Sequence, residues 1–315
     1  MATQRIDAPS PARAGVEAAD VVRRARRGDP AGIVLRPAGP ADIPACGRIL
    51  YDAFATLATR HGFPPDFPTV EVATACVRGL IGNPGFHGVV AERDGVILGS
   101  TFLDERSIIS AVGPVSVDPT AQDGKVGRSL MEAMLERAAE RRAAGVRLLQ
   151  ISYNNRSLSL YAKLGFDVRE SCAAMVGEPV GLVLPGYGVR TAGPADEGAC
   201  NALCVRVHGH DRAGELHHAL LKGRVRVVER LGRITGYTTG ITYFGHAVAE
   251  TNDDLQALIG AATRLGEPGF IVPLRNTDLF RWCLAHGLRV FFVMNLMTIG
   301  LYQEPAGAYL PSVGY

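Results

Sequence analysis

One segment of the chain occurs twice, and this duplication limits the folds available to it. Residues 36–46 read RPAGPADIPAC and residues 190–200 read RTAGPADEGAC, so eight of the eleven positions are identical at an offset of 154. Two further matched pairs follow in the same order: 92–99 (ERDGVILG) with 229–236 (ERLGRITG), and 164–168 (LGFDV) with 286–290 (HGLRV). Because three matched segments keep their order, the sequence predicts two copies of one fold.

The repeat divides the 315 residues into two expected domains, a first copy at 33–185 and a second copy at 188–302, each of ordinary domain size. A Gly- and Pro-rich stretch near 181–188 is expected to link them. Residues 1–32 are rich in Ala and Arg, and we expect a flexible leader there. Residues 303–315 contain Pro and aromatic residues, so we expect an extended, docked tail.

Both copies show the same coarse pattern of helices and strands. In the matched PAD segments, Asp42 and Asp196 are expected to cap helices that begin immediately after them. The 92–99 and 229–236 segments predict hairpins. The first copy adds a strand at 107–117, an amphipathic helix at 127–143, a strand at 146–152, a short helix at 157–165 and a last strand pair from Phe166 to Gly177. This mixture predicts an α/β fold in which helices flank a mixed, mostly antiparallel sheet.

The composition excludes several classes of protein. With a formal net charge of +2, the chain offers no general electrostatic surface for nucleic acid or a membrane. The six cysteines form no CxxC pair, so we expect reduced thiols in a cytoplasmic protein. The histidines of HGHDRAGELHH (208–218) match no recurrent zinc spacing, so we expect no metal and interpret them as surface residues at a helix corner. The alternative is that His210 or His217 lines an acceptor pocket.

A short loop before the 127–143 helix is the first candidate binding site. A β-branched strand ends at Asp118, and Gln122, Gly124 and Gly127 follow before the helix begins. Backbone N–H groups at a helix start lack partners within the helix and attract anions. Lys125 and nearby Arg128 add positive charge. The loop therefore suits a diphosphate, although an ordinary turn before a helix would have a similar composition.

Two motifs resemble those of the GNAT superfamily of acyl-CoA N-acyltransferases. The first is Gln-x-x-Lys-x-Gly at 122–127, and the second is NNRSLSLYAKLGF at 154–166. The resemblance covers about 33–185. In that family the first motif has Gly where Lys125 stands here, and we expect Gly124 to compensate.

The resemblance implies an acetyl-CoA site in the first copy. Strands before and after the loop would splay apart, with the pantetheine arm between them, and Tyr161 would protonate the leaving thiolate. The backbone of Val115 and Val117 would pair with the arm, near Asn154 and Ser157. The diphosphate would lie against the loop and first helical turn: Gln122, Asp123, Gly124, Lys125, Val126, Gly127, Arg128 and Ser129.

The proton acceptor for the substrate amine is less well marked. The strand AVGPVSV contains no acid, so Asp104 and Glu105, at the end of the preceding strand, are the nearest candidates by sequence. Tyr153 could belong to a water chain, and the terminal carboxylate of Tyr315 could serve if the tail folds back. The acceptor pocket is expected to draw on the early helices, through Tyr51, Phe54, His61 and Phe63, and on the second copy.

The second copy is expected to have lost this chemistry. The Gln loop is absent, and Asp253 and Asp254 lie where phosphates would rest, which would repel them. Asn276 still aligns with Asn154, but Cys283 replaces Tyr161. The sequence thus predicts an N-acetyltransferase that moves an acetyl group from acetyl-CoA to a primary amine of a small molecule, with homodimerisation possible. The alternatives are a protein lysine or N-terminal acetyltransferase, and a non-catalytic acyl-CoA sensor.

Overall fold

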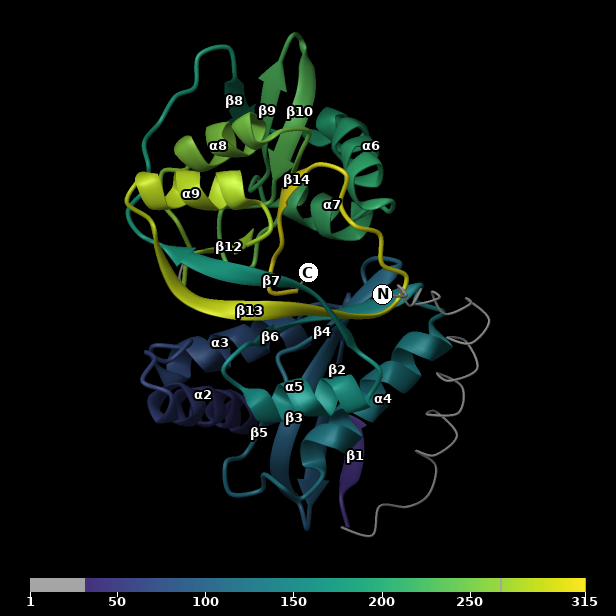
Figure 1. Ribbon diagram of the computed structural model, residues 1–315. Coiled ribbons are helices and arrows are strands. Elements are labelled where there is room, and N and C mark those ends of the chain that lie inside the picture. Colours follow the sequence, from purple (N-terminus) through teal and green to yellow (C-terminus); the bar gives the residue numbers. More distant parts are fainter. Residues whose placement is uncertain (1–31, 267, 315) are drawn as a thin grey trace, which may run out of the picture.

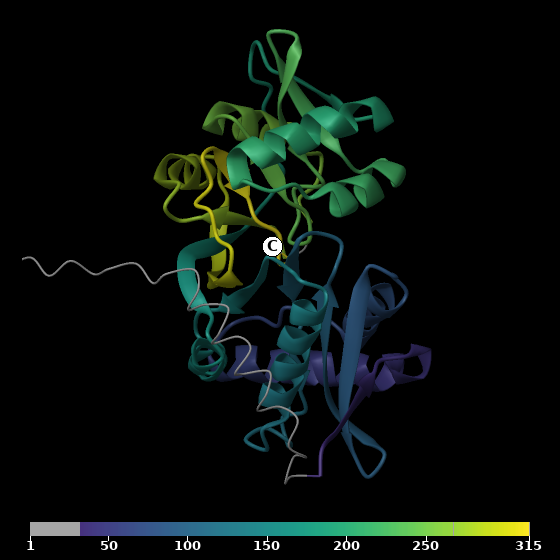
Figure 2. The same cartoon turned by 90° about the vertical axis from the view of Figure 1, so that its right-hand side faces the viewer.

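The computed structural model describes residues 32–266 and 268–314, which form two sheets with helices packed on both (Figure 1). Nearly all of the expected leader, and Tyr315 with its terminal carboxylate, lie outside the described residues. Figure 2 shows the two helix-covered regions stacked one above the other. In the described part of the chain, no helix has both the length and the apolar character that a bilayer span requires.

The larger sheet confirms the predicted mixed α/β fold. Its strands run β1 (Val34–Pro37), β2 (Phe86–Arg93), β3 (Val96–Asp104), β4 (Ile109–Val112), β6 (Gly145–Ile151), β13 (Arg289–Gly300), β7 (Asp167–Val176) and β12 (Phe270–Pro273), and β5 (Ser116–Val117) pairs with β3. Neighbours are antiparallel except β4 and β6, which are parallel. The hairpin between β2 and β3 turns at Asp94 and Gly95, as the pattern predicts.

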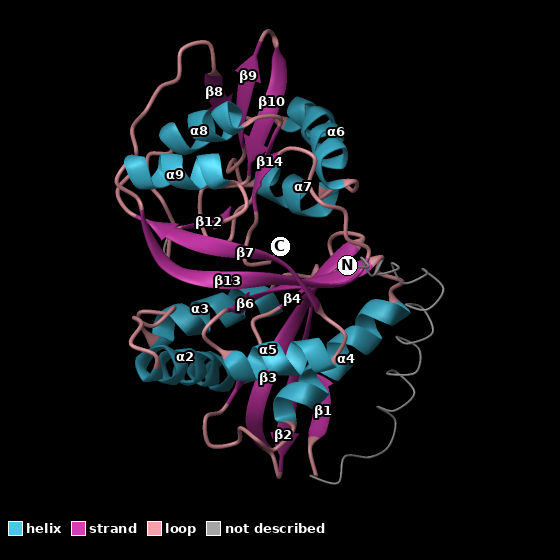
Figure 3. Cartoon of the chain, viewed as in Figure 1, coloured by secondary structure: helices cyan, strands magenta, loops and turns pink. Residues whose placement is uncertain are grey.

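The final strands of the two copies have exchanged neighbours. β13, from the second copy, lies between β6 and β7, and β7 pairs on its other edge with β12. Figure 3 shows β7 and β13 crossing the junction between the two stacked regions. The expectation of a strand pair at 166–177 is therefore wrong: β7 is one strand, and its buried residues 172–175 need partners on both edges. The boundaries 33–185 and 188–302 describe the repeat. However, each sheet also contains strands from outside one of these segments: β12 and β13 in the larger sheet, and β14 in the smaller one.

The smaller sheet contains the tail. Its order is β14 (Ala308–Leu310), β11 (Ala247–Ala249), β10 (Arg233–Thr238), β9 (Arg226–Arg230) and β8 (Gly188–Thr191). The tail is extended, and it adds β14 to the edge of β11 in an antiparallel pairing. Tyr309 is buried there, with its hydroxyl bonded to Glu170 of β7. The tail is thus held by residues of both copies.

Helices cover the two sheets. They are α2 (Ile43–Arg60), α3 (Val70–Ile81), α4 (Val126–Glu140), α5 (Asn155–Lys163), α6 (Glu197–His208), α7 (Ala213–Leu221), α8 (Asn252–Gly260) and α9 (Thr277–Ala285). α4 corresponds to the amphipathic helix expected at 127–143, and its Leu130, Met131 and Met134 are fully buried. α2 and α3 pack together on the face of β2 and β3 opposite to α4, through a separate apolar cluster that includes Val90 and Phe102.

The repeated PAD segment forms the same turn in both copies. A 3₁₀ turn at Pro40–Asp42 leads into α2, and one at Pro194–Asp196 leads into α6. The helices begin where expected, but Asp42 does not cap α2, because its carboxylate accepts from the backbone N–H of Gly39 and from Arg36, each at 2.8 Å. Asp196 has the same role in the second copy, where Arg190 lowers its pKa to about 2. The matched Arg, Gly and Asp therefore preserve one local structure.

Candidate active site

The first feature of the site is a gap between β5 and β6. β4 and β6 pair in parallel only as far as Ala111 and Arg147. In β3, Leu103 pairs with Val112 of β4 and Gly99 pairs with Val117 of β5. The segment from β4 to β5 therefore contains one residue more than the facing part of β3. Such a bulge bends its strand, so β5, which follows the bulge, no longer pairs with β6. The strands diverge as the sequence motifs imply.

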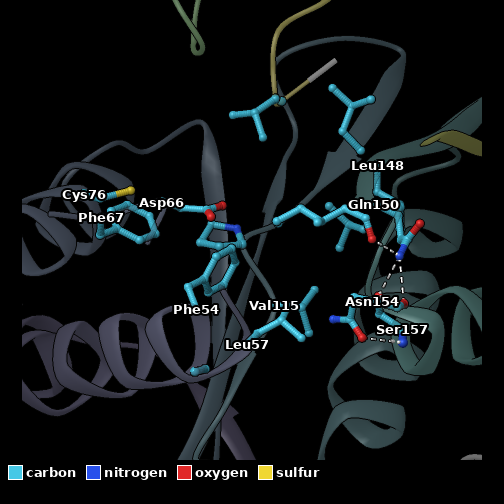
Figure 4. A pocket seen from close by; sticks show the side chains of 18 of the residues that line it. Phe54, Leu57, Asp66, Phe67, Cys76, Val115, Leu148, Gln150, Asn154 and Ser157 are labelled. Carbon is cyan, nitrogen blue, oxygen red and sulfur yellow. Dashed lines mark hydrogen bonds between the residues drawn. The ribbon is translucent and has the colours of Figure 1, made fainter. Parts of the chain in front are cut away.

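A cavity of about 1160 Å³ occupies this gap. Figure 4 shows residues of α2 and α3 on one wall and Gln150, Asn154 and Ser157 on the opposite wall, with Val115 between them. The expected coenzyme residues that line it are Val115, Val117, Gln122, Asp123, Lys125, Val126, Gly127, Arg128, Asn154, Ser157 and Tyr161. Gly124 and Ser129 do not line it.

The outer edge of β5 faces the cavity, and no strand pairs with it among the described residues, although the carbonyl of Val117 accepts from Gln122 Nε2 at 3.5 Å. The N–H of Asp118 donates to the carbonyl of Leu98 at 2.8 Å, so Asp118 and Ser116 are the residues whose main-chain groups point toward β3. Because these groups alternate along an antiparallel strand, those of Val115 and Val117 point away from β3. An extended ligand can therefore add to this edge as an extra strand.

The start of α4 lies beside that edge without a side-chain cap among the described residues. Asp123 (φ 73°) and Lys125 (φ 65°) have left-handed backbones, and Gly124 does not. The expectation that Gly124 replaces the family's middle glycine is therefore wrong, because Lys125 itself adopts the conformation that glycine favours. A Cβ at Gly127 would lie 3.6 Å from Val117, an ordinary contact, so protein atoms alone do not require glycine there. The bare backbone instead leaves room for a ligand.

On the opposite wall, Asn154 is a structural cap as well as a candidate contact. Its Oδ1 accepts from the N–H of Ser157 at 3.1 Å, which begins α5. Buried Gln150 donates to the carbonyl of Asn154 at 2.9 Å and to Ser157 Oγ at 3.1 Å, as the dashed lines in Figure 4 show. Asn295 of β13 donates to Gln150 at 2.9 Å. Gln150 was not predicted from the sequence, where its one signal is a polar residue within the apolar run VRLLQIS.

Tyr161 lies on α5 and lines the cavity. Its side chain belongs to the apolar cluster that includes Leu130 and Met134, and its ring lies 6.0 Å from that of Phe166. Burial raises the pKa of the Tyr161 phenol above its usual range, so the hydroxyl keeps its proton at neutral pH. This is the protonation state that a general acid requires.

The two acids expected as bases are already paired with arginines. Glu105 accepts from Arg137 at 2.7 Å and contacts Arg141 at 3.3 Å, and it does not line the cavity. Asp104 lines the cavity, but both of its oxygens accept from Arg106. The structure therefore does not bring Glu105 to the site, and it leaves Asp104 neutralised by its neighbour.

A third acid, Asp66, was not identified from the sequence. It lies between α2 and α3 and lines the cavity, and its buried Oδ1 accepts no hydrogen bond from the described residues. Burial raises the pKa of Asp66 to about 7. The buried hydroxyl of Tyr153, whose ring stacks on Phe63, also has no partner in the described chain. Nothing in the segment FPPDFP distinguishes this carboxyl from one on a solvated loop.

The acceptor end of the cavity differs in part from the expected set. Phe54 and His61 line it, whereas Tyr51 and Phe63 do not, and Phe63 stacks on Tyr153 with ring centroids 4.4 Å apart. The second copy and the tail supply the remaining wall: Glu215, His218, Arg224, Tyr243, Phe244, Pro268, Ser312, Val313 and Gly314.

The histidines are arranged differently from the surface cluster that was expected. His208 and His210 are buried, and burial lowers the pKa of His210 to about 4. His218 lines the cavity, and the two histidines expected as alternatives, His210 and His217, do not. His217 is exposed and contacts Glu197 at 3.2 Å. Among the described residues, no group of three or more His, Cys, Asp or Glu side chains is arranged to hold a metal.

The equivalent place in the second copy is filled by protein. Gly236 pairs with Ala249 as Gly99 pairs with Val117, so β11 corresponds to β5. β14 covers its outer edge. At the start of α8, Thr251 Oγ1 donates to buried Asp254 at 2.6 Å and caps the helix in return. The edge and the helix start that are open in the first copy are therefore both occupied here.

Comparison with known proteins agrees with this geometry. Residues 84–168 match the family model described as an acetyltransferase (GNAT) domain. Over 109 residues the chain is 29% identical to the IAA acetyltransferase of Azospirillum brasilense, an alignment that covers 33% of this chain and 69% of that protein.

Two solved structures resemble almost the whole chain. A protein of Pyrococcus horikoshii described as an acetyltransferase aligns with a TM-score of 0.68 and 18% identity, covering 90% of this chain and 95% of that one. The GCN5-related N-acetyltransferase of Sphaerobacter thermophilus aligns with a TM-score of 0.59 and 17% identity, covering 89% and 99%. These similarities show a shared fold that extends through both copies.

Proposed function

Because this chain belongs to the GNAT superfamily, we propose that it transfers an acetyl group from acetyl-CoA to a primary amine of a small molecule. The observation that carries the proposal is the open edge of β5 beside the uncapped start of α4. These two features suit the two parts of an acyl-CoA: the amide-bearing pantetheine arm and the diphosphate. The second copy, in which both are filled, is assigned no coenzyme.

In the proposed complex, the arm pairs with the main chain of Val115 and Val117, and the diphosphate rests on the N–H groups of Val126, Gly127 and Arg128. Lys125 at the cavity wall adds positive charge. The thioester would then lie between the two walls of the cavity, within reach of Tyr161 on α5.

The proposed reaction is a direct attack on the thioester. The amine nitrogen forms a bond to the acetyl carbon, and the bond from that carbon to sulfur breaks. Tyr161 donates its proton to the departing thiolate. Burial raises the pKa of the phenol, so Tyr161 is protonated when the coenzyme binds.

The wall supplied by the second copy favours a small acceptor over a protein. Tyr243 and Phe244 of the second copy line the cavity, and Val313 of the tail donates to the carbonyl of Tyr243 at 2.8 Å. A lysine on a folded protein would need an open approach at this end. We therefore place the protein acetyltransferase second, and a non-catalytic sensor third because Tyr161 is retained.

Calorimetry with acetyl-CoA tests the coenzyme site. Gly127→Asp places a carboxylate where the diphosphate is proposed to lie, so we expect binding to be lost. Gly198→Asp is a matched control, because Gly198 is also the second residue of its helix and a Cβ there meets nothing within 4 Å. Equal affinity in the two variants would refute the site. Release of free thiol on mixing acetyl-CoA with a panel of amines then tests the activity.

A further inference from the structure

The acceptor end of the cavity contains a carboxyl group without a partner. Asp66 forms no ion pair with any described residue, and its Oδ1 is buried without a hydrogen bond. Figure 4 shows it on the α2–α3 wall near Phe67, across the cavity from Gln150. Removing a carboxylate from water without a partner is costly, so this oxygen is a place where a bound cation would be stabilised.

The surroundings of Asp66 are mostly aromatic. Phe54 and Phe67 are in edge-to-face contact at 5.6 Å on its own wall, and Tyr153, which follows β6, stacks at 4.4 Å on Phe63, which is close to Asp66 in the chain. Tyr243 of the second copy covers this end, and its ring packs edge-on against Phe292 at 6.3 Å. Aromatic faces attract cations and bury apolar groups. These rings offer few partners for a molecule with many hydroxyl groups, and the polar side chains of this end, such as His218 and Arg224, come from the second copy.

We propose that Asp66 binds the ammonium group of the acceptor and takes its proton, and that the acceptor is a primary amine on an apolar, preferably aromatic, body. This inference rests on the proposed acetyl transfer and names its acceptor class and its base. The other acids near this end of the cavity do not compete for the role. Asp104 is paired with Arg106, Glu215 is paired with Arg212 and His246, and Glu105 does not line the cavity.

The protons balance through named groups. The ammonium has three protons, and the first passes to Asp66, which frees the lone pair for attack on the acetyl carbon. When the bond from carbon to sulfur breaks, Tyr161 protonates the sulfur and recovers a proton from the nitrogen of the new amide. The third proton remains on that nitrogen. After the product leaves, Asp66 returns its proton to solvent, so one proton is released per turnover.

The test uses the full chain and four amines: 2-phenylethylamine, hexylamine, glucosamine and a lysine-containing tetrapeptide. We expect the first two to have the highest kcat/KM. Asp66→Asn should lower kcat/KM for them by about 100-fold, the usual scale of general-base catalysis, while the Kd for acetyl-CoA stays within about 2-fold. The control is Glu71→Gln, an exposed acid on α3 that does not line the cavity, and it should match the wild type.

A binding measurement separates this inference from the proposed function. Saturation-transfer NMR should detect 2-phenylethylamine on the wild-type protein loaded with coenzyme A, and should show a clear loss of signal for Asp66→Asn. If the wild type transfers acetyl to none of the amines, the proposed function fails. If it transfers acetyl but Asp66→Asn behaves as the wild type, or if glucosamine or the peptide is preferred, the proposed function stands and this inference is wrong.

Discussion

Replacing Asp66 by Asn should change how the stability of the protein depends on pH, independently of any activity. Burial raises the pKa of Asp66 from an ordinary value of 3.8 to about 7 in the folded protein. Between pH 5 and pH 8, Asp66 is ionised throughout in the unfolded chain but passes from protonated to ionised in the folded chain. The folded state therefore binds the extra proton at low pH, and its stability falls as pH rises to about 7.

The size of the effect follows from the interval between pH 5 and the pKa of Asp66 in the folded protein. About two pH units separate pH 5 from the folded pKa, and each unit corresponds to about 1.4 kcal/mol, so the ionisation of Asp66 should lower the free energy of unfolding by about 3 kcal/mol. Water that enters the cavity would screen the charge, so this is an upper limit and about 1.5 kcal/mol is a reasonable expectation. Asp66→Asn cannot ionise and should lack this decrease.

Urea denaturation of both proteins at pH 5 and pH 8 measures the difference. The effects of the other titratable groups at this end of the cavity largely cancel, because these groups are the same in both proteins: His61, Tyr153, Glu215, His218 and Tyr243. Glu71→Gln is the control: the Thr69 hydroxyl lowers the pKa of exposed Glu71, so any change there has the opposite sign. Parallel stability curves for wild type and Asp66→Asn would refute the burial of an unpaired carboxyl.

Three further substitutions test other parts of the account. Tyr161→Phe should lower kcat by about 100-fold, as expected for a lost general acid, with the acetyl-CoA Kd unchanged by calorimetry; an unchanged kcat removes Tyr161 from the mechanism. Lys125→Gly should raise the free energy of unfolding by about 1 kcal/mol, because a left-handed backbone is strained for lysine, and a loss in urea denaturation would contradict this. Tyr309→Ala should cost about 3–5 kcal/mol, the usual loss for a large buried ring, and a cost below 1 kcal/mol would show that β14 does not anchor the tail.

The repeat predicted local structure well because it depends on neighbouring residues. The PAD segments form identical turns, since the Arg, Gly and Asp that make each turn lie within seven residues of one another. The two hairpins and the start of α4 follow from similarly local patterns. These parts of the fold needed no knowledge of distant contacts.

The exchange of strands could not be predicted from the same pattern. β7 and β13 are matched copies, and an apolar strand pairs equally well with either neighbour as far as its own residues indicate. Which partner each strand takes depends on the path of the chain between the sheets. A repeat in the sequence therefore predicts the number of strands better than their neighbours.

The parts of the candidate site formed by a local backbone motif could be predicted from the sequence. The parts that depend on the burial of a side chain by distant residues could not. The loop was predicted from its glycine spacing and Tyr161 from the resemblance to the GNAT motif, and both line the cavity. Asp66 was not predicted, because its environment is created by Tyr153 and Tyr243, which are far from it in the chain. Glu105 was expected at the site because it is close in sequence to the strand end, but its side chain is directed to Arg137 instead.

A crystal structure of the protein with coenzyme A tests the central claim most directly. The account predicts density for the diphosphate at the start of α4, against Gly127, and for the pantetheine arm along the open edge of β5 at Val115 and Val117. Density beside Asp253 at the start of α8, displacement of β14 from β11 by the arm, or an empty cavity at saturating coenzyme would contradict it.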